Sequence, residues 1–519
     1  MSTQCLIKTS EYHDSITLMQ IARELVQLPG VVDVAVVMAT EANRAILRQA
    51  GLLRPEIDAA TPNDLVVAVL ADSDDHAERA LYAAEARLAA RDEPHKTGSS
   101  CQLRTIRAAA RGANLAIVSV AGQYAAAEAW EALKNGLHVL LFSDNVSIED
   151  EIALKRYAVE HGLLMMGADC GTAILNGVAL CFANAVPRGS VGLVAASGTG
   201  LQEVSTLLAR LGVGVSQGIG TGGRDLKEAV GGLTMIQGLK ALQADPGTRV
   251  LVLISKPPAQ AVAERVLAQV RQSDKPAVVC FLGGDPSPIV QAGAIPARTL
   301  QEAAYLAAAE IGHDLSSLDQ MLERERAELK AQAEMLRGRL KTGQRYLRGL
   351  FSGGTLASEA LVIWQEMLDG VWSNVPLDPR FKLADAAHSR GHCAVDLGED
   401  EFTVGRPHPM LDHDLRIRRL LQEAADPEVA VILLDVVLGY GVHPDPAGEL
   451  GPAIREARQR AARDGRELIV VASITGTEGD PQQLGRQVRA LEEAGTVIAS
   501  CNAAAARLTG YVVAGKELP

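Results

Sequence analysis

The chain repeats one local pattern along most of its length: an apolar segment, a turn of small residues, and an amphipathic stretch. Residues 192–196 (Gly-Leu-Val-Ala-Ala) run into Ser-Gly-Thr-Gly at 197–200, after which leucine and valine recur at helical spacing. Residues 431–437 lead in a similar way into Gly-Tyr-Gly at 439–441. Strands that alternate with helices form parallel sheets covered by helices on both faces. The pattern therefore predicts an α/β protein.

Length and changes in composition suggest several domains. The 519 residues include a polar segment at 92–100, whose proline and glycine are typical of a linker. Residues 314–345 are rich in Glu, Arg, Lys, Gln and Leu, which predicts a long helix. This helix either connects two domains in solvent or binds a partner. We divide the chain into a small α+β domain with a ferredoxin-like arrangement (1–95), α/β segments (100–187 and 188–313), a linker helix (314–345), and a last α/β segment (346–519) with a loop-rich insertion (371–414).

Composition excludes several classes of protein. The net charge of −13, with no basic stripe and no interleaved aromatics, argues against a nucleic-acid partner. The seven cysteines are scattered and contain no Cys-x-x-Cys, which argues against a disulfide scaffold or a zinc ribbon. No apolar run reaches about 18 residues and no leader is recognisable, so we expect a cytoplasmic protein with no membrane partner.

The two glycine-rich turns are candidate anion sites. A helix start leaves backbone N–H groups free at the positive end of the helix dipole, and ligands of parallel sheets gather at the carboxyl ends of strands. The alternative is that the glycines only permit tight packing. Lys256 and Arg224 follow other predicted strands and would add positive charge. We predict phosphate contacts from Ser197, Gly198, Thr199, Gly200, Gly439, Tyr440 and Gly441.

Histidines gather in and just after the predicted insertion. They are His388, His392, His408, His413 and His443. Three interpretations are open: ligands of a divalent metal ion, a loop that contacts substrate, or histidines with structural hydrogen bonds. Pro407 and Pro409 flank His408 and indicate a rigid loop. We therefore assign no metal, and expect Arg406 and His408 to contact an anionic substrate.

Several motifs resemble those of a known family. Gly167-Ala168-Asp169-Cys170-Gly171 and Ala196-Ser197-Gly198-Thr199 match turns of the α subunit of succinyl-CoA synthetase over about 113–312. Asp396-Leu397-Gly398 and the segment 426–439 resemble the carboxyl-terminal domain of its β subunit. With Gly405-Arg406-Pro407-His408-Pro409-Met410 and the extra first domain, the chain resembles the FdrA family of acyl-CoA synthetase-like proteins. The resemblance implies a Rossmann-like CoA-binding-type domain followed by two flavodoxin-like synthetase-type domains.

Two departures from the synthetases indicate altered chemistry. Gln291 stands where the synthetases carry a phosphorylated histidine, and Lys256 stands where the carboxylate partner of that histidine lies. A glutamine cannot carry a phosphoryl group. The chain also resembles no ATP-grasp domain, so an ordinary nucleotide-driven CoA ligase is not expected from this chain alone.

The FdrA resemblance implies the large subunit of an oxamate carbamoyltransferase of ureide (allantoin) catabolism. That reaction converts oxalurate and phosphate to oxamate and carbamoyl phosphate, and needs companion subunits encoded nearby. On this hypothesis Lys256, Arg406 and His408 act in catalysis, phosphate is a substrate, no cofactor is required, and the protein is an oligomer that binds small anions. The alternatives are a CoA-thioester enzyme with a modified succinate–CoA ligase mechanism and a non-catalytic scaffold subunit.

Overall fold

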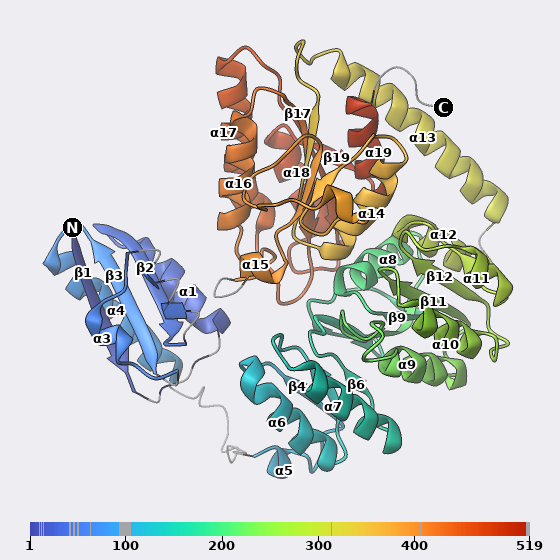
Figure 1. Ribbon diagram of the computed structural model, residues 1–519, viewed down its shortest axis with the longest axis horizontal. Coiled ribbons are helices and arrows are strands. Elements are labelled where there is room, and N and C mark those ends of the chain that lie inside the picture. Colours follow the sequence, from blue (N-terminus) through green and yellow to red (C-terminus); the bar gives the residue numbers. More distant parts are fainter. Residues whose placement is uncertain are drawn as a thin grey trace. The chain divides into compact units, whose positions relative to one another are not determined.

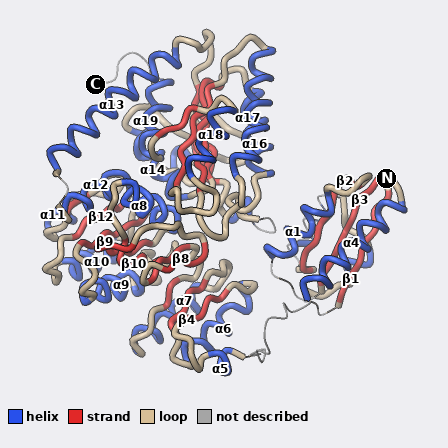
Figure 2. Tube along the Cα trace, turned by 180° about the vertical axis from the view of Figure 1, so that it is seen from behind, coloured by secondary structure: helices blue, strands red, loops and turns tan. Residues whose placement is uncertain are grey.

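The computed structural model describes the chain except residues 10, 12, 14, 41–42, 45–46, 49–50, 63, 93–104, 313, 404–406 and 515–519. The chain forms two compact units, shown as a ribbon in Figure 1 and by secondary structure in Figure 2. The first comprises Met1–Arg104 and Asp400–Pro407, and the second Thr105–Glu399 and His408–Pro519. No helix in the described ranges is both long and apolar enough to cross a membrane.

The first unit is a small α+β domain, as the sequence predicts. Its antiparallel sheet has the order β1-β3-β2. Alternate residues of β3 face opposite ways, so Val67 packs with one apolar cluster and Val66 with a second, which explains why this strand is apolar throughout. Its elements are β1 (Ser2–Lys8), α1 (Ser15–Val26), β2 (Val31–Met38), α3 (Pro55–Asp58), β3 (Leu65–Ala71), α4 (Asp74–Asp92) and α15 (Asp400–Thr403).

The second unit begins with a three-stranded parallel sheet of order β4-β5-β6. Ser147 caps α7 by accepting a hydrogen bond from the amide of Asp150, as expected of serine at a helix start. The elements are α5 (Ile106–Ala109), β4 (Leu115–Val118), α6 (Gly122–Lys134), β5 (His138–Leu141), α7 (Ile148–Glu160) and β6 (Met165–Met166).

A seven-stranded sheet of order β13-β12-β11-β9-β10-β7-β8 follows. Strands β13 to β10 in that order are parallel, and the hairpin β7–β8 joins β10 antiparallel. The strands are β7 (Thr172–Leu175), β8 (Val178–Cys181), β9 (Arg188–Ala195), β10 (Val215–Gly220), β11 (Val250–Ser255), β12 (Ala277–Phe281) and β13 (Ile295–Pro296). The helices are α8 (Gly198–Arg210), α9 (Leu233–Ala244), α10 (Gln260–Val270), α11 (Ser287–Gln291) and α12 (Leu300–Glu310).

The last sheet is parallel throughout, with the order β15-β16-β14-β17-β18-β19. Figure 1 shows α16 and α17 on one side of β17, and α14 and α19 on the other. The strands are β14 (Tyr346–Phe351), β15 (Trp372–Ser373), β16 (Cys393–Asp396), β17 (Val429–Val437), β18 (Ile469–Thr475) and β19 (Val497–Ala499). The helices are α13 (Leu315–Arg337), α14 (Gly354–Gln365), η1 (Pro379–Phe381), α16 (Asp414–Ala425), α17 (Pro446–Arg463), α18 (Leu484–Glu493) and α19 (Asn502–Val513).

The two larger sheets share one apolar core, because α8 and α12 of one pack against α14 and α19 of the other. Two buried glutamates cross this junction. Glu203 of α8 accepts a hydrogen bond from the amide of Asn502 at the start of α19 (3.0 Å). Glu359 of α14 accepts one from the amide of Leu300 at the start of α12 (2.6 Å). Each acid thus caps the last helix of the other α/β layer, which ties the two together.

Helix α13 joins the two larger sheets in sequence and packs against α19. Leu329, Ala333 and Leu336 are buried in the shared core, and the Arg337 guanidinium donates to the carbonyl of Val512 (3.1 Å). One face of the helix is therefore part of the core. The mixed α/β class with parallel sheets and a small first domain, predicted from the sequence, is confirmed.

Candidate functional site

The starts of α8 and α14 meet, although they lie in different sheets. Ser197, the N-cap of α8, accepts a hydrogen bond from the amide of Gly200 (2.8 Å), and its hydroxyl lies 2.5 Å from that of Thr355 in the first turn of α14. A Cβ placed on Gly353, the N-cap of α14, would lie 2.9 Å from Cγ2 of Thr199. Two helix starts with their free N–H groups therefore share one place, an arrangement that favours a bound anion.

The α14 start is held by a buried carboxylate from the neighbouring strand β17. Asp435 accepts hydrogen bonds from the amides of Ser352 and Gly353 (both 2.8 Å) and from the Ser352 hydroxyl (2.9 Å). The guanidinium of Arg416 donates to the same carboxylate (2.9 Å), and both side chains are buried. Asp435 thus fixes the turn that leads into α14, whose N-cap Gly353 has no side chain to accept from the helix amides.

Lys256 and Asp396 lie beside the first residue of α14. A Cβ placed on Gly354 would lie 2.5 Å from Oδ2 of Asp396 and 3.3 Å from Nζ of Lys256, so only glycine lets the Asp396 carboxylate approach the helix start this closely. The ammonium of Lys256 is 4.0 Å from Glu399, and both side chains are about two-fifths exposed (43% and 42%). Such a half-exposed pair is weak. Lys256 can therefore turn its charge toward an incoming anion.

Burial raises the pKa of Asp396 to about 7, with Lys256 acting against the rise and Glu399 adding to it. The carboxylate also accepts a hydrogen bond from the amide of Gly398 (2.9 Å). Its backbone is fixed by Asn374, which donates to the Asp396 carbonyl and accepts from its amide (both 2.9 Å). A carboxyl group near half-protonation at neutral pH is suited to acid–base work.

His408 lies next to this group. Its Nε2 is 2.9 Å from the position of a Cβ on Gly398. Burial and the nearby charge of Arg416 lower the pKa of His408 to about 4, so the ring is neutral at pH 7. The amide of Met410 donates to Nδ1 (3.3 Å), which places the proton on Nε2. Arg406, expected with His408 at the substrate, lies outside the described residues.

The turn Gly439-Tyr440-Gly441 differs from the expectation of a second phosphate loop. It is not a helix start, because α17 begins only at Pro446. The amide of Gly439 donates to Gln482 (3.1 Å), and the amide of Tyr440 donates to the carbonyl of Ala183 (2.9 Å). These amides are used in packing this turn against a neighbouring loop. The partner of the α8 start is the α14 start instead.

Gln291 and Arg224 make no described contact with the two helix starts. Gln291 ends the short helix α11 with an exposed side chain, and none of the described contacts joins it to Lys256 or to the helix starts. Arg224 pairs with the buried carboxylate of Glu151 (2.8 Å), which also pairs with Lys155 (2.9 Å). The charge of Arg224 is thus used in a structural ion pair that joins α7 to the segment after β10.

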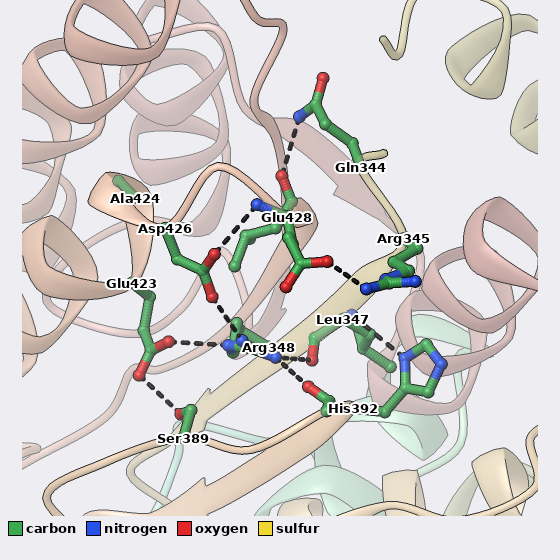
Figure 3. A network of polar contacts seen from close by, with 12 residues as sticks. Gln344, Arg345, Leu347, Arg348, Ser389, His392, Glu423, Ala424, Asp426 and Glu428 are labelled. Carbon is green, nitrogen blue, oxygen red and sulfur yellow. Dashed lines mark hydrogen bonds and ion pairs between the residues drawn. The ribbon is translucent and has the colours of Figure 1, made fainter. Parts of the chain in front are cut away.

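The histidines of the insertion are dispersed. His388 is exposed and pairs with Asp385 (2.7 Å). His392 accepts from the amide of Leu347 at the beginning of β14 (3.2 Å), the strand end opposite the helix starts. Figure 3 shows it beside a network in which Arg348 bridges Glu423 and Asp426 at 2.7 and 2.9 Å. This network is structural, because it holds the insertion and α16 against β14.

One group in the described ranges has the composition of a metal site. Ligand atoms of His413, His443 and Glu449 lie within 4.8 Å of one another. However, the amide of Asp445 donates to Nδ1 of His443 (3.1 Å), which leaves the proton of the neutral ring on Nε2. That nitrogen faces Glu449 at 3.2 Å. The contact is therefore a hydrogen bond between side chains, and this geometry does not favour a metal ion.

Sequence reasoning missed Ser352-Gly353-Gly354-Thr355 as the second helix start, and Asp396 and Asp435 as its neighbours. A signal was present: Thr199 and Thr355 each follow an apolar strand and a glycine turn, and each precedes a glutamate by four residues (Glu203 and Glu359). This matching pattern could have paired the two starts. No comparable pattern in the sequence indicates that Asp396 and Asp435 are buried.

Family models match two parts of the chain. Residues 350–512 match the model described as CoA-ligase, and residues 1–104 match the one described as AllF, heavy metal-associated domain. The first domain does not fit a metal ion: the sequence has no Cys-x-x-Cys, and no group of three ligating side chains lies together in its described residues. Cys5 is half-buried in β1, and burial raises the pKa of its thiol.

Curated relatives cover the whole chain or its middle. The chain is 46% identical over 509 residues to the protein YahF of Escherichia coli (strain K12), covering 96% of each. It is 28% identical over 178 residues to the α subunit of the ADP-forming succinate–CoA ligase of Methanothermobacter thermautotrophicus, 34% of this chain and 59% of that one. It is 27% identical over 207 residues to the malate–CoA ligase α subunit of Methylorubrum extorquens, covering 38% and 68%. The predicted resemblance to succinyl-CoA synthetase α is confirmed.

Proposed function

This chain belongs to the family of the Escherichia coli protein YahF, within the acyl-CoA synthetase-like proteins, and we propose that it is an acyl-transferring enzyme subunit that uses phosphate. The observation that carries the proposal is the meeting of the α8 and α14 starts beside Lys256. Fixed N–H donors and a nearby ammonium stabilise the charge of a transferring group without reorganisation. The phosphate would bind at Gly354, between Lys256 and the first turn of α14.

The finer proposal is transfer of a carbamoyl group. Gln291, at the position of the synthetase phosphohistidine, cannot carry a phosphoryl group, so free phosphate would act directly. This fits phosphorolysis of oxalurate to oxamate and carbamoyl phosphate, which needs no cofactor. His408, neutral with a proton on Nε2, would donate a hydrogen bond to the carboxylate substrate together with Arg406. Companion subunits would complete the site in a cytoplasmic oligomer.

The second candidate is a CoA-thioester enzyme. The match of residues 350–512 to the CoA-ligase model favours it, as do the succinate–CoA and malate–CoA ligase relatives. Such an enzyme would need a phosphoryl carrier other than Gln291. Saturable binding of CoA to the purified chain would support this candidate.

The test is binding of phosphate to the full chain by calorimetry, for the wild type and Lys256→Met. Loss of one charge-assisted contact predicts affinity lower by roughly 10- to 100-fold, with unchanged thermal stability. Lys240→Met, on the exposed side of α9, is the matched control and keeps wild-type affinity. Equal phosphate binding by Lys256→Met and the wild type would place the anion elsewhere.

The activity itself is tested with the chain and its companion subunits, supplied with oxamate and carbamoyl phosphate. Release of phosphate that requires both and is lost in Lys256→Met supports the carbamoyltransferase. No release, combined with saturable CoA binding, supports the thioester enzyme. No binding of phosphate, carbamoyl phosphate or CoA would point to a scaffold subunit.

A further inference from the structure

A buried carboxyl group lies at the place where the structure is most suited to an anion. Asp396 ends β16 as a residue only 2% exposed, and its Oδ2 lies 2.5 Å from the Cβ position of Gly354. Nζ of Lys256 is 3.3 Å from the same point. An ionised Asp396 would repel a phosphate bound here, whereas a protonated one would donate a hydrogen bond to it. The protonation state of this one group therefore decides how the site receives an anion.

Four charged or titratable side chains near Asp396 come from different parts of the described chain. Lys256 approaches from the end of β11, and Glu399 follows two residues after the strand end. His408 lies across Gly398, and Asp435 in strand β17 acts on Asp396 through its charge, which is paired to Arg416. Burial and the two acids oppose ionisation of Asp396, while Lys256 alone among these groups favours it.

We propose that Asp396 is the proton donor of the phosphate site, holding its proton against the bound phosphate and passing it to the leaving group. The inference rests on the proposed use of phosphate by this chain. It is carried by geometry. The carboxyl is fixed through Asn374 and the Gly398 amide, and its second oxygen lies against the first residue of α14, 2.5 Å from the Cβ position of Gly354. A protonated, buried aspartate that donates a hydrogen bond to reacting oxygen is a known way to run acid chemistry at neutral pH.

The step balances without a further reactant. An oxygen of HPO₄²⁻ attacks the carbonyl carbon of an N-acyl or N-carbamoyl substrate, so that a C–O bond forms and the C–N bond breaks. The nitrogen leaves with the electron pair of the broken bond and takes the proton of Asp396. The resulting carboxylate recovers a proton from the hydroxyl of the attacking phosphate, which ends as a dianionic acyl phosphate. Asp396 is thus regenerated, and no oxidant or reductant is involved.

Sulfate is the best first probe, because its charge does not change near neutral pH, unlike that of phosphate. We expect sulfate to bind the wild-type chain roughly fivefold more tightly at about pH 6 than at about pH 8, if the bound anion raises the pKa of Asp396 by about one unit. Asp396→Asn can still accept the Gly398 hydrogen bond and stays neutral. Its sulfate affinity is expected to be the same at both pH values and close to the wild-type value at the lower one.

The same variant separates binding from catalysis. With companion subunits present, Asp396→Asn should lose acyl transfer by roughly 10²- to 10⁴-fold, because it binds the anion but has no proton to give. Glu359→Gln removes the other buried carboxyl whose pKa is about 7 and should leave the pH dependence of sulfate binding in place.

Three results overturn the inference: wild-type pH dependence in Asp396→Asn, undiminished transfer by that variant, or a wild-type sulfate affinity that is flat across this pH range. The last measurement needs no variant, so it decides the question even if Asp396→Asn does not fold. Failure of sulfate and phosphate to bind the wild type at any pH would instead refute the proposed function, and this inference with it.

Discussion

The starts of α8 and α14 occupy equivalent places in their sheets but are stabilised in different ways. Helix α8 has a serine N-cap whose hydroxyl binds the amide of Gly200, so its cap lies within four residues of sequence. Helix α14 has Gly353 at this position and depends on Asp435, more than 80 residues away, with Arg416 behind it. The comparison teaches that one helix start is locally encoded, whereas the other is held by a buried charge pair. Substitutions at the support of the α14 start should therefore lower the free energy of unfolding more than substitutions at the α8 start.

The largest expected effect is on the α14 side. Asp435→Asn keeps the shape of the side chain but leaves the guanidinium of Arg416 buried without its counter-charge. Breaking a buried pair in this way costs about 3–5 kcal/mol in the free energy of unfolding. Urea-induced unfolding measures it, with Asp414→Asn, which breaks an exposed pair with Arg418, as the control. A loss below about 1 kcal/mol would show that the turn does not depend on Asp435.

The next effect concerns Glu203 of α8 and Glu359 of α14, the two buried glutamates that each cap a helix of the other sheet. Burial and the charge of Glu203 raise the pKa of Glu359 to about 7. The unfolded chain ionises this group near its ordinary pKa of about 4.5, so the folded state loses relative stability as pH rises from there to about 7. The loss amounts to a few kcal/mol at most.

Glu359→Gln should flatten this part of the stability profile, measured by denaturant unfolding at about pH 5.5 and about pH 7.5. The exposed Glu366→Gln, at the end of the same helix, is the control and should keep the wild-type slope. If the free energy of unfolding of Glu359→Gln changes with pH as much as that of the wild type, Glu359 is already ionised in the folded chain at the lower pH.

The smallest effect is expected at the α8 start. Ser197→Ala removes the cap of α8 and the hydroxyl contact with Thr355, and should lower the free energy of unfolding by about 1 kcal/mol. Because the backbone N–H groups stay in place, phosphate affinity should change less than in Lys256→Met. Thermal unfolding and calorimetry on the two variants make the comparison. A destabilisation as large as that of Asp435→Asn would show that the two starts are equally dependent on their supports.

Much of the fold follows from local patterns in the sequence. Apolar strands, glycine turns and amphipathic helices predicted the parallel sheets, because a strand buried on both faces must be apolar throughout. The same logic found Ser197, whose cap needs only its own helix, and Lys256, which follows a buried strand directly. It also selected the turn Gly439-Tyr440-Gly441, where the amides of Gly439 and Tyr440 instead donate to Gln482 and Ala183. Glycine content alone does not reveal which backbone groups remain free.

By itself the sequence determined the class of fold, the α8 start and the lysine beside the candidate site. Only the tertiary structure decided that the α8 start meets the α14 start, 158 residues away between Ser197 and Thr355, and that Asp396 and Asp435 are buried around it. The physical reason is that caps and strand burial depend on neighbours in sequence. The position of a helix start and the pKa of a carboxyl instead depend on which faces of two separate sheets pack together.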